Sequence, residues 1–403
     1  MAGALAGTTV LELTRVSPGS FCTMVLADMG AEVLKIETPP GLRRTAGSGG
    51  SAQEARRAAF SYLNRNKRSL ALNLKTPEGQ TILHKLMAQA DVLVEGFRPG
   101  VMQRLNADYA TLRAINPRLV YCSLSGFGQD GPYRDRPGHD LNYLAMSGVL
   151  NLIGATDRPP PIPLNLIADY GGAAMHGVLG ILLALFARYR TGTGQHVDVA
   201  YLDATIALLA ATPLLANAFA DGTFPQRGHG PYTGLYAFYT TYETQDGQRL
   251  AVGCSEPWFW DNLCQALGRP EFASHYRRVE HLTRAPSAAE ARVREEVQAI
   301  FLQRPREEWL AYLANKNVCV SPVNTAAEVF ADPQLQQRQM RLEHRTATGD
   351  VVTQVGIGLK LSDTPGSVRH LGPQVGQHTD EVLTALGYNA DERQSFRAAG
   401  VVG

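Results

Sequence analysis

The chain has 403 residues, of which 44% are hydrophobic, so it can fill more than one core and two or more lobes are expected. Its 38 Lys and Arg residues balance 37 Asp and Glu residues, which excludes a bulk charge that would attract nucleic acid or an acidic membrane. The five cysteines are odd in number and form no CxxC pair, which argues against a disulfide framework and a zinc site.

The chain opens with a strand–helix–strand pattern. Residues 10–14 and 31–36 have the apolar runs of buried strands, and 21–29 between them have helical spacing that stops at Gly30. The alternation then continues with a helix over 77–89, a strand over 91–96, a helix over 107–115 and a strand over 119–123. This pattern predicts an α/β fold of the Rossmann type, with a parallel sheet and helices on both faces.

The most apolar stretch is 173–187. Its length of about 15 residues is short of the roughly 20 that a membrane-spanning helix needs, so it predicts a buried core helix. The N-terminal residues 1–9 have no cationic patch followed by a long apolar run, which is unlike a signal peptide. A cytoplasmic protein without a membrane partner is therefore expected.

The composition changes after 198–211. Aromatic residues crowd into 232–242, where their density is as typical of a core as of an apolar ligand tunnel, and a strand over 250–253 and a helix over 258–267 follow. We therefore predict a large α/β domain over 1–210, a smaller α+β domain over 211–324 and a C-terminal segment over 325–403 that returns to the first domain.

Several cofactor and catalytic motifs are absent from the sequence. No GxGxxG follows a predicted strand, so a nicotinamide cofactor is not expected. No HxxxH or HExxH supports a metal site, and no GxSxG supports a serine hydrolase.

A basic cluster is the first candidate site. Arg65, Lys67 and Arg68 lie close together, and Lys75 and Arg98 follow further on. Guanidinium and ammonium groups suit phosphate oxygens, especially near the carboxyl end of a strand. Alone, such a segment is more typical of a solvated basic turn.

Three further residues have the chemistry of acids and bases. His139 can exchange a proton near neutral pH, although a lone histidine is more often structural. Asp169 precedes the apolar helix, where it could be an N-cap, or a proton donor if apolar surroundings raise its pKa. Glu256 stands between a strand and a helix, where it could complement the helix dipole or orient a histidine.

Taken together, these segments resemble the class III CoA-transferase family, also called CaiB/BaiF. The family-wide signals, in chain order, are at 10–13, 26–31, 65–70, 72–75, 97–100, 121–128 and 191–195. Narrower signals resemble the alpha-methylacyl-CoA racemases within this family and are at 138–143, 163–166, 238–242 and 251–257.

The resemblance implies a site for the CoA portion of an acyl-CoA substrate on the first lobe, with no separate cofactor. The CoA-binding residues that it implies are Arg65, Lys67, Arg68, Leu72, Lys75, Arg98, Gly138 and Tyr143. Thr38 and Asn73 depart from the residues that relatives usually carry, so they alter the expected CoA contacts. Relatives form interlocked homodimers in which two chains build each site, and the same is expected here.

The resemblance also implies the chemistry. As in the racemases, His139 and Asp169 are expected to move the proton next to the thioester, through an enolate, while Glu256 of the partner chain supports His139. Backbone amides near the helix after Asp169 are candidate donors to the enolate oxygen. In the transferases of the family the matching aspartate is a covalent nucleophile, which is the main alternative. An acyl-CoA binding protein without catalysis would need only the basic cluster.

Overall fold

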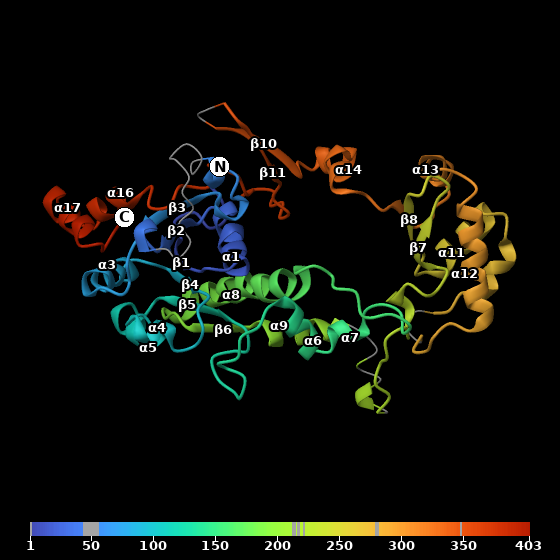
Figure 1. Cartoon of the computed structure of the whole chain (residues 1–403), viewed down its shortest axis with the longest axis horizontal. Coiled ribbons are helices and arrows are strands. Elements are labelled where there is room, and N and C mark those ends of the chain that lie inside the picture. The colour runs from blue at the N-terminus through green and yellow to red at the C-terminus, as the bar shows by residue number, and fades with distance from the viewer. Residues whose placement is uncertain are drawn as a thin grey trace. The chain divides into compact units, whose positions relative to one another are not determined.

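The computed structural model of the chain divides into two compact units (Figure 1). It describes residues 2–42, 56–211, 215, 218–220, 222–278, 282–346 and 349–403. The first unit consists of Met1–Tyr143, Asn165–Thr205 and Asp332–Gly403, and the second consists of Leu144–Leu164 and Ile206–Ala331.

A six-stranded parallel sheet forms the centre of the first unit, in the order β3-β2-β1-β4-β5-β6. The strands are β1 (Thr9–Leu13), β2 (Glu32–Glu37), β3 (Lys67–Ala71), β4 (Val92–Glu95), β5 (Val120–Ser125) and β6 (His196–Ala200). The predicted α/β fold with a parallel sheet is thus confirmed. Central strands that are covered on both faces read as continuous apolar runs, which is why the sequence revealed them.

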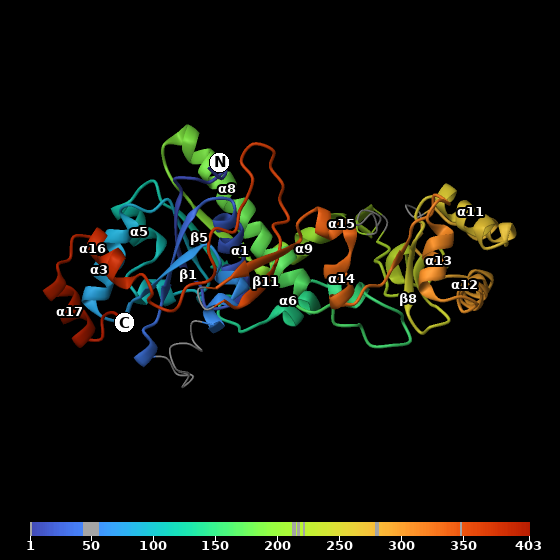
Figure 2. The same ribbon diagram turned by 90° about the horizontal axis from the view of Figure 1, so that it is seen from above.

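Helices cover both faces of this sheet (Figure 2). On one face lie α1 (Ser17–Asp28) and α8 (Met175–Thr191), which contact each other. The other face carries α3 (Pro77–Met87), α4 (Val101–Arg104), α5 (Tyr109–Ile115), α16 (Thr379–Ala385) and α17 (Ala390–Ala398). The helix predicted over 21–29 begins earlier, at Ser17, because Pro18 fits the first turn of a helix, where its missing N–H is not needed.

The two edge strands, β3 and β6, were not predicted. β3 begins with Lys67 and Arg68, which the sequence analysis assigned to a basic phosphate-binding cluster and not to a strand. β6 contains His196 and Asp198 and lacks a continuous apolar run. Edge strands carry more polar residues than central ones, so hydrophobic patterning detects them poorly.

The strand order reverses between β1 and β4. From β1 the chain adds β2 and β3 on one side and then crosses to β4 on the other side. In open parallel sheets, ligands bind in the crevice that forms at such a reversal, beyond the carboxyl ends of the strands. The loops after β1 and β4 are therefore the first place to look for a site.

The second unit is α+β, with a three-stranded antiparallel sheet in the order β7-β8-β9. Its elements include β7 (Tyr239–Glu243), β8 (Arg249–Gly253), β9 (Val320–Pro322), α7 (Val149–Leu152), α11 (Pro257–Ala266), α12 (Ala288–Phe301), α13 (Arg306–Leu313) and α14 (Ala326–Ala331). Tyr236, Phe238 and Tyr242 are buried in its core with Trp260 and Phe301. Most of the aromatic cluster is therefore core, although Tyr232 is exposed.

Further elements belong to the first unit or connect it to the second unit. They are α6 (Asp140–Met146), η3 (Leu166–Ala174), α9 (Tyr201–Leu208), α15 (Pro333–Gln337), and the antiparallel pair β10 (Arg341–Arg345) and β11 (Val351–Val355).

One continuous helical run, Leu166–Thr191, is long and apolar enough by length and composition to cross a membrane. It is longer than the predicted helix because the π-helical segment η3 continues directly into α8. Helices inside globular proteins can be equally long and apolar, so length and composition do not by themselves assign this helix to a membrane. Only 39% of its most apolar window is buried, so much of its apolar surface is open.

Candidate active site

A cavity of about 450 Å³ opens at the carboxyl ends of the parallel strands. Its wall is built from the loops at the strand-order reversal, 16–18 after β1 and 96–99 after β4, from 124–126 at the end of β5, and from Tyr201 after β6. The segment 136–139 with Tyr143, Asn165 and Asp169 closes the wall. Its position is the one that a doubly wound sheet favours for a ligand.

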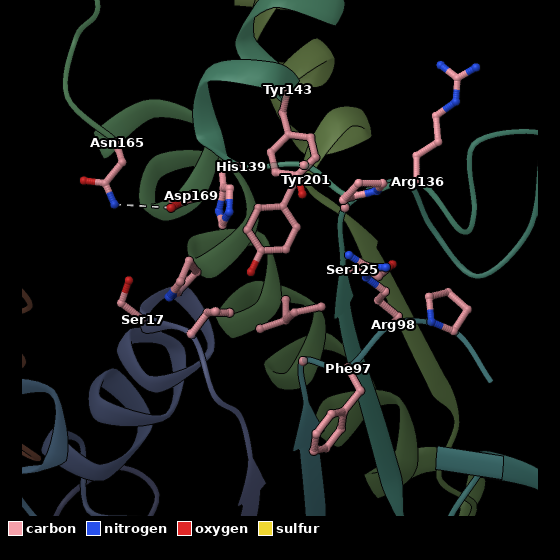
Figure 3. A pocket seen from close by; sticks show the side chains of 18 residues that line it. Ser17, Phe97, Arg98, Ser125, Arg136, His139, Tyr143, Asn165, Asp169 and Tyr201 are labelled. Atoms are coloured by element: carbon pink, nitrogen blue, oxygen red, sulfur yellow. Dashed lines mark hydrogen bonds between the residues drawn. The ribbon is translucent and has the colours of Figure 1, made fainter. Parts of the chain in front are cut away.

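His139 immediately precedes α6 and its side chain is exposed at the cavity (Figure 3). The backbone N–H of His139 donates to Asn142 Oδ1 at 3.0 Å, and the carbonyl oxygen of His139 accepts the Asn142 N–H at 2.8 Å. These reciprocal bonds fix the start of the helix. His139 is therefore held by its backbone, while its imidazole remains available to a ligand.

Asp169 lies inside the π-helical segment η3, not at an N-cap, so the N-cap interpretation of this residue is wrong. Asp140 caps the segment from α6 instead, because its Oδ1 accepts the N–H groups of Ala168 and Asp169, each at 2.9 Å. Asn165 Nδ2 donates to Asp169 Oδ2 at 3.2 Å. π-helical turns occur frequently at functional sites. Asp140 thus joins two segments that are distant in sequence and brings Asp169 to His139.

The surroundings of Asp169 raise the pKa of its carboxyl group. Burial raises the pKa of the Asp169 carboxyl above its usual range, the nearby charge of Asp140 adds to this effect, and the Asn165 hydrogen bond and His139 oppose it. A carboxyl group with a raised pKa can hold a proton closer to neutral pH and then release it. Such a group beside a histidine is suited to proton transfer.

Two tyrosines complete this part of the wall. The Tyr143 ring is wedged between two glycines: a Cβ on Gly138 would lie 2.7 Å from the ring, and one on Gly126 would lie 2.6 Å from the hydroxyl. Tyr201 packs against Tyr143 with ring centroids 5.2 Å apart. Tyr201 was missed by the sequence analysis because it follows β6, a strand that was not predicted.

Arginines lie at the same cavity. Arg98 and Arg136 both line it and both are exposed (Figure 3). The Arg136 guanidinium lies 4.0 Å from the centroid of the Tyr133 ring, and the Arg15 guanidinium lies 5.7 Å from that of Phe97. Exposed guanidinium groups beside a cavity can bind phosphate or carboxylate oxygens.

Glu95 supports the turn that carries Arg98. It is buried at the end of β4, where its Oε2 accepts the Phe97 N–H at 2.8 Å and its carboxyl also bonds to Ser123. Burial raises the pKa of Glu95 to about 7, against these hydrogen bonds. The carboxyl group holds Phe97 and Arg98 in place from beneath the cavity.

The predicted basic cluster does not form part of the cavity wall. Arg65 is buried and its guanidinium lies 2.6 Å from Asp28, and Lys67 is fully buried with its ammonium 2.7 Å from Glu12. We expected these two cations to be open to phosphate. That prediction is wrong, because each cation is already paired with a carboxylate inside the protein. Arg68 is half-buried beside Glu381, Leu72 is buried, and Lys75 is exposed away from the cavity lining.

The Glu12–Lys67 pair supports the cavity indirectly. Glu12 accepts hydrogen bonds from Thr14 at 2.6 Å, Ser20 at 2.7 Å and Thr23 at 2.6 Å, and the Lys35 ammonium lies 3.7 Å away. Thr14 and Ser20 flank the loop 16–18, which lines the cavity. Lys67 therefore belongs to the network that anchors this loop.

Glu256 belongs to the second unit. It occupies the N-cap position of α11, but its side chain makes no capping hydrogen bond there, so the carboxylate is not used as a cap. Of the predicted site residues, His139, Asp169, Arg98, Gly138 and Tyr143 are brought together at the cavity. Within the described part of the chain, no cluster of His, Cys, Asp and Glu could hold a metal ion.

The chain is similar to known proteins over almost its whole length. The model of CoA-transferase family III matches residues 5–379. The alpha-methylacyl-CoA racemase of Mus musculus is 38% identical over 392 residues, which cover 96% of this chain and 94% of that protein. The succinyl-CoA–L-malate CoA-transferase beta subunit of Chloroflexus aurantiacus is 34% identical over 397 residues, which cover 96% of this chain and 95% of that protein.

A solved structure has the same fold over nearly the whole length. The CAIB/BAIF family protein from Brucella suis superposes with a TM-score of 0.78 at 32% sequence identity, covering 96% of this chain and 100% of that chain. The relatives therefore include a racemase and a CoA-transferase.

Proposed function

This chain belongs to CoA-transferase family III, and on that premise we propose that it racemises 2-methylacyl-CoA thioesters. The observation that carries the proposal is that His139 and Asp169 line one cavity. The pKa of the Asp169 carboxyl is raised there. The 38% identity to a racemase supports the proposal.

The reaction needs two proton-transfer groups. A hydrogen next to a thioester is weakly acidic, so one group removes it as a proton while the C–H electron pair forms the enolate. The second group then returns a proton to the opposite face, and the configuration is inverted. We assign these roles to His139 and Asp169, whose order depends on the direction of the reaction. Each positioned acid or base contributes about 10²–10⁴ in rate.

The test follows the α-hydrogen directly. A single enantiomer of a 2-methylacyl-CoA is incubated in deuterium oxide, with and without an added carboxylate, and is analysed by mass spectrometry and chiral separation. Uptake of one deuterium with loss of enantiomeric purity, without the carboxylate, is the expected result. The proposal fails if no deuterium enters the thioester.

A CoA-transferase is the second candidate, because relatives with that activity are 34% identical. In that reaction the Asp169 carboxylate would attack the thioester carbonyl and expel the CoA thiolate, forming an acyl anhydride. This step needs the ionised carboxylate. Transfer of CoA to the added carboxylate without deuterium uptake would identify this alternative.

We further propose that Arg98 binds the CoA phosphates at the cavity. Arg98→Ala is expected to raise the dissociation constant of CoA by about ten-fold or more, since a hydrogen bond to a charged group contributes roughly 1.5–3 kcal/mol. Titration calorimetry with CoA measures this change. Arg113→Ala, which removes an exposed arginine of α5 outside the cavity wall, is the matched control. Equal affinities for the two variants would remove Arg98 from this role.

We also propose that two copies of the chain associate through α8. Leu179, Leu183 and Phe186 lie on one side of this helix and are 54%, 58% and 63% exposed. Monomeric proteins rarely expose contiguous apolar patches larger than a few hundred Å². A second copy is the proposed occupant, because the family resemblance implies an interlocked homodimer.

Leu183→Arg is expected to convert the dimer into a monomer, because burying an unpaired charge in an apolar interface is unfavourable. Light scattering after size exclusion measures the mass. Gln394→Arg adds the same charge to the exposed surface of α17 and should leave the dimer intact. A dimeric Leu183→Arg variant would contradict the assignment of α8.

The dimer proposal includes Glu256 as a residue that the partner chain contributes beside His139. If so, inactive His139→Ala and Glu256→Gln chains should regain activity when they are mixed and allowed to exchange. One of the two sites in each mixed dimer then contains only unaltered residues. If both residues come from the same chain, mixing restores nothing.

A further inference from the structure

The Tyr201 hydroxyl is a polar group at the cavity that the roles proposed above do not use. Tyr201 is largely buried and lines the same cavity as His139 and Asp169. No hydrogen bond of this hydroxyl is found among the described residues. The hydroxyl is therefore positioned for a group that enters the cavity.

The backbone around Tyr201 is firmly held. Register pairs Ser125 at the end of β5 with Ala200 at the end of β6, so Tyr201 emerges at the carboxyl edge of the sheet. The Leu202 N–H donates to the Gly126 carbonyl oxygen at 3.2 Å, and the Thr205 hydroxyl donates to the Tyr201 carbonyl oxygen at 2.7 Å. Its ring packs on Tyr143. The hydroxyl thus needs little reorganisation to meet a ligand.

The charge pattern near Tyr201 keeps its hydroxyl protonated. Burial raises the pKa of Tyr201, and the nearby charges of Asp169 and Tyr143 raise it further. A phenol that stays neutral remains a hydrogen-bond donor throughout the reaction. Figure 3 shows that Tyr201 and His139 both belong to the wall of this cavity.

Two backbone donors near Asp169 are already occupied. The N–H groups of Ala168 and Asp169, at the start of the helical run, both donate to Asp140 Oδ1. Those two amides therefore cannot also stabilise a negatively charged oxygen of the substrate. Tyr201 stands at the end of a different strand and offers a donor from another part of the wall.

From this geometry we infer that Tyr201 is a catalytic residue that donates a hydrogen bond to the thioester oxygen as the enolate forms. The inference rests on the proposed racemase function. When a base removes the α-proton, the C–H pair forms the C=C bond and the carbonyl π pair moves to the oxygen. Tyr201 keeps its own proton and stabilises that oxygen. On reprotonation of the carbon the electrons return, and the hydrogen bond weakens.

Tyr201→Phe tests this role, because it removes only the hydroxyl and keeps the ring that packs on Tyr143. The kcat for racemisation is expected to fall by about 10²–10³-fold, the loss seen when one donor to a developing oxyanion is removed. KM and the dissociation constant of CoA should stay within about three-fold, since the interaction strengthens in the transition state. Deuterium uptake at the α-carbon should slow by the same factor as racemisation.

Tyr170→Phe is the matched control. It removes a tyrosine hydroxyl next to Asp169 in sequence, from a side chain that packs on Phe21 with ring centroids 5.2 Å apart and does not line the cavity. Its kcat should stay within about three-fold of the unaltered enzyme. Thermal unfolding of both variants verifies that each is folded.

Each outcome has one meaning. A kcat of Tyr201→Phe equal to that of Tyr170→Phe would overturn the inference, and so would a raised KM with an unchanged kcat, which indicates uniform binding. If the unaltered enzyme itself takes up no deuterium, the proposed function fails first, and no enolate exists for Tyr201 to stabilise. Normal uptake by the unaltered enzyme with a slow Tyr201→Phe variant supports both proposals.

Discussion

His139→Ala and Asp169→Asn are each expected to lower racemisation by about 10²–10⁴-fold, the contribution of one positioned acid or base. In a mechanism with one group on each face of the enolate, losing either group leaves one face without a positioned acid or base, so inversion becomes slow. The remaining group can still remove and return a proton on its own face. Each variant should therefore exchange the α-hydrogen of one enantiomer only, and with retention of configuration.

The measurement uses the two enantiomers separately. Each is incubated in deuterium oxide, and deuterium content and enantiomeric purity are followed over time. The two variants should prefer opposite enantiomers. His84→Ala, which alters a histidine of α3 on the other face of the sheet, is the control and should behave like the unaltered enzyme. Near-normal inversion by a folded His139→Ala variant would refute the two-group mechanism.

The same variants separate the racemase from the transferase. If Asp169 is a nucleophile, Asp169→Asn abolishes CoA transfer to a carboxylate, whereas His139→Ala affects it much less. If both are proton carriers, the two variants lose a similar amount of activity. Calorimetry with CoA verifies that neither substitution has disturbed the binding of the CoA portion.

Lys67→Met is expected to destabilise the first unit by about 3–5 kcal/mol, because it leaves a buried charge without its partner. Glu12 and Lys67 are both fully buried, and their side chains lie 2.7 Å apart. Burial alone would raise the pKa of Glu12, but Lys67 and Lys35 outweigh burial and lower it from 4.5 to about 2. The contribution of this carboxylate is thus fully present above pH 4.5 and is lost as the pH falls toward 2.

Urea unfolding followed by far-ultraviolet circular dichroism measures this loss. Tryptophan fluorescence is unsuitable, because Trp258, Trp260 and Trp309 all lie in the second unit. The control is Arg68→Met at the next position, where a half-exposed pair with Glu381 should contribute less than about 1 kcal/mol.

A double variant identifies the cause of the loss. Glu12→Gln together with Lys67→Met removes both charges, so it should be more stable than Lys67→Met alone, and the difference gives the coupling between the two residues. Equal losses for Lys67→Met and Arg68→Met would show that Lys67 is not committed to an internal ion pair. In that case Lys67 would again be a candidate for binding a phosphate group of CoA.

The dimer has a concrete surface in α8 and a direct test. The cytoplasmic location expected from the sequence stays a prediction, as do the domain boundaries drawn from the change in composition.

The sequence by itself determined the parallel sheet and identified His139 and Asp169 as the candidate proton-transfer residues. The central strands are buried on both faces, so their apolar runs are visible without any tertiary information. His139 and Asp169 stand in segments whose order along the chain resembles the family, and the structure places both at one cavity. These features depend on local patterning and on motif order, both of which a sequence contains.

Only the tertiary structure decided the surroundings of these residues. Lys67 proved to be a buried partner of Glu12 because β2 lies between their two strands and α1 covers that face, and hydrophobic patterning records neither relation. Asp140 reaches Ala168 and Asp169 across 28 and 29 positions, and Tyr201 enters the cavity only because β6 pairs with β5. Side-chain partners across strands follow from sheet order and register, which form between segments far apart in the chain and leave no period in its sequence.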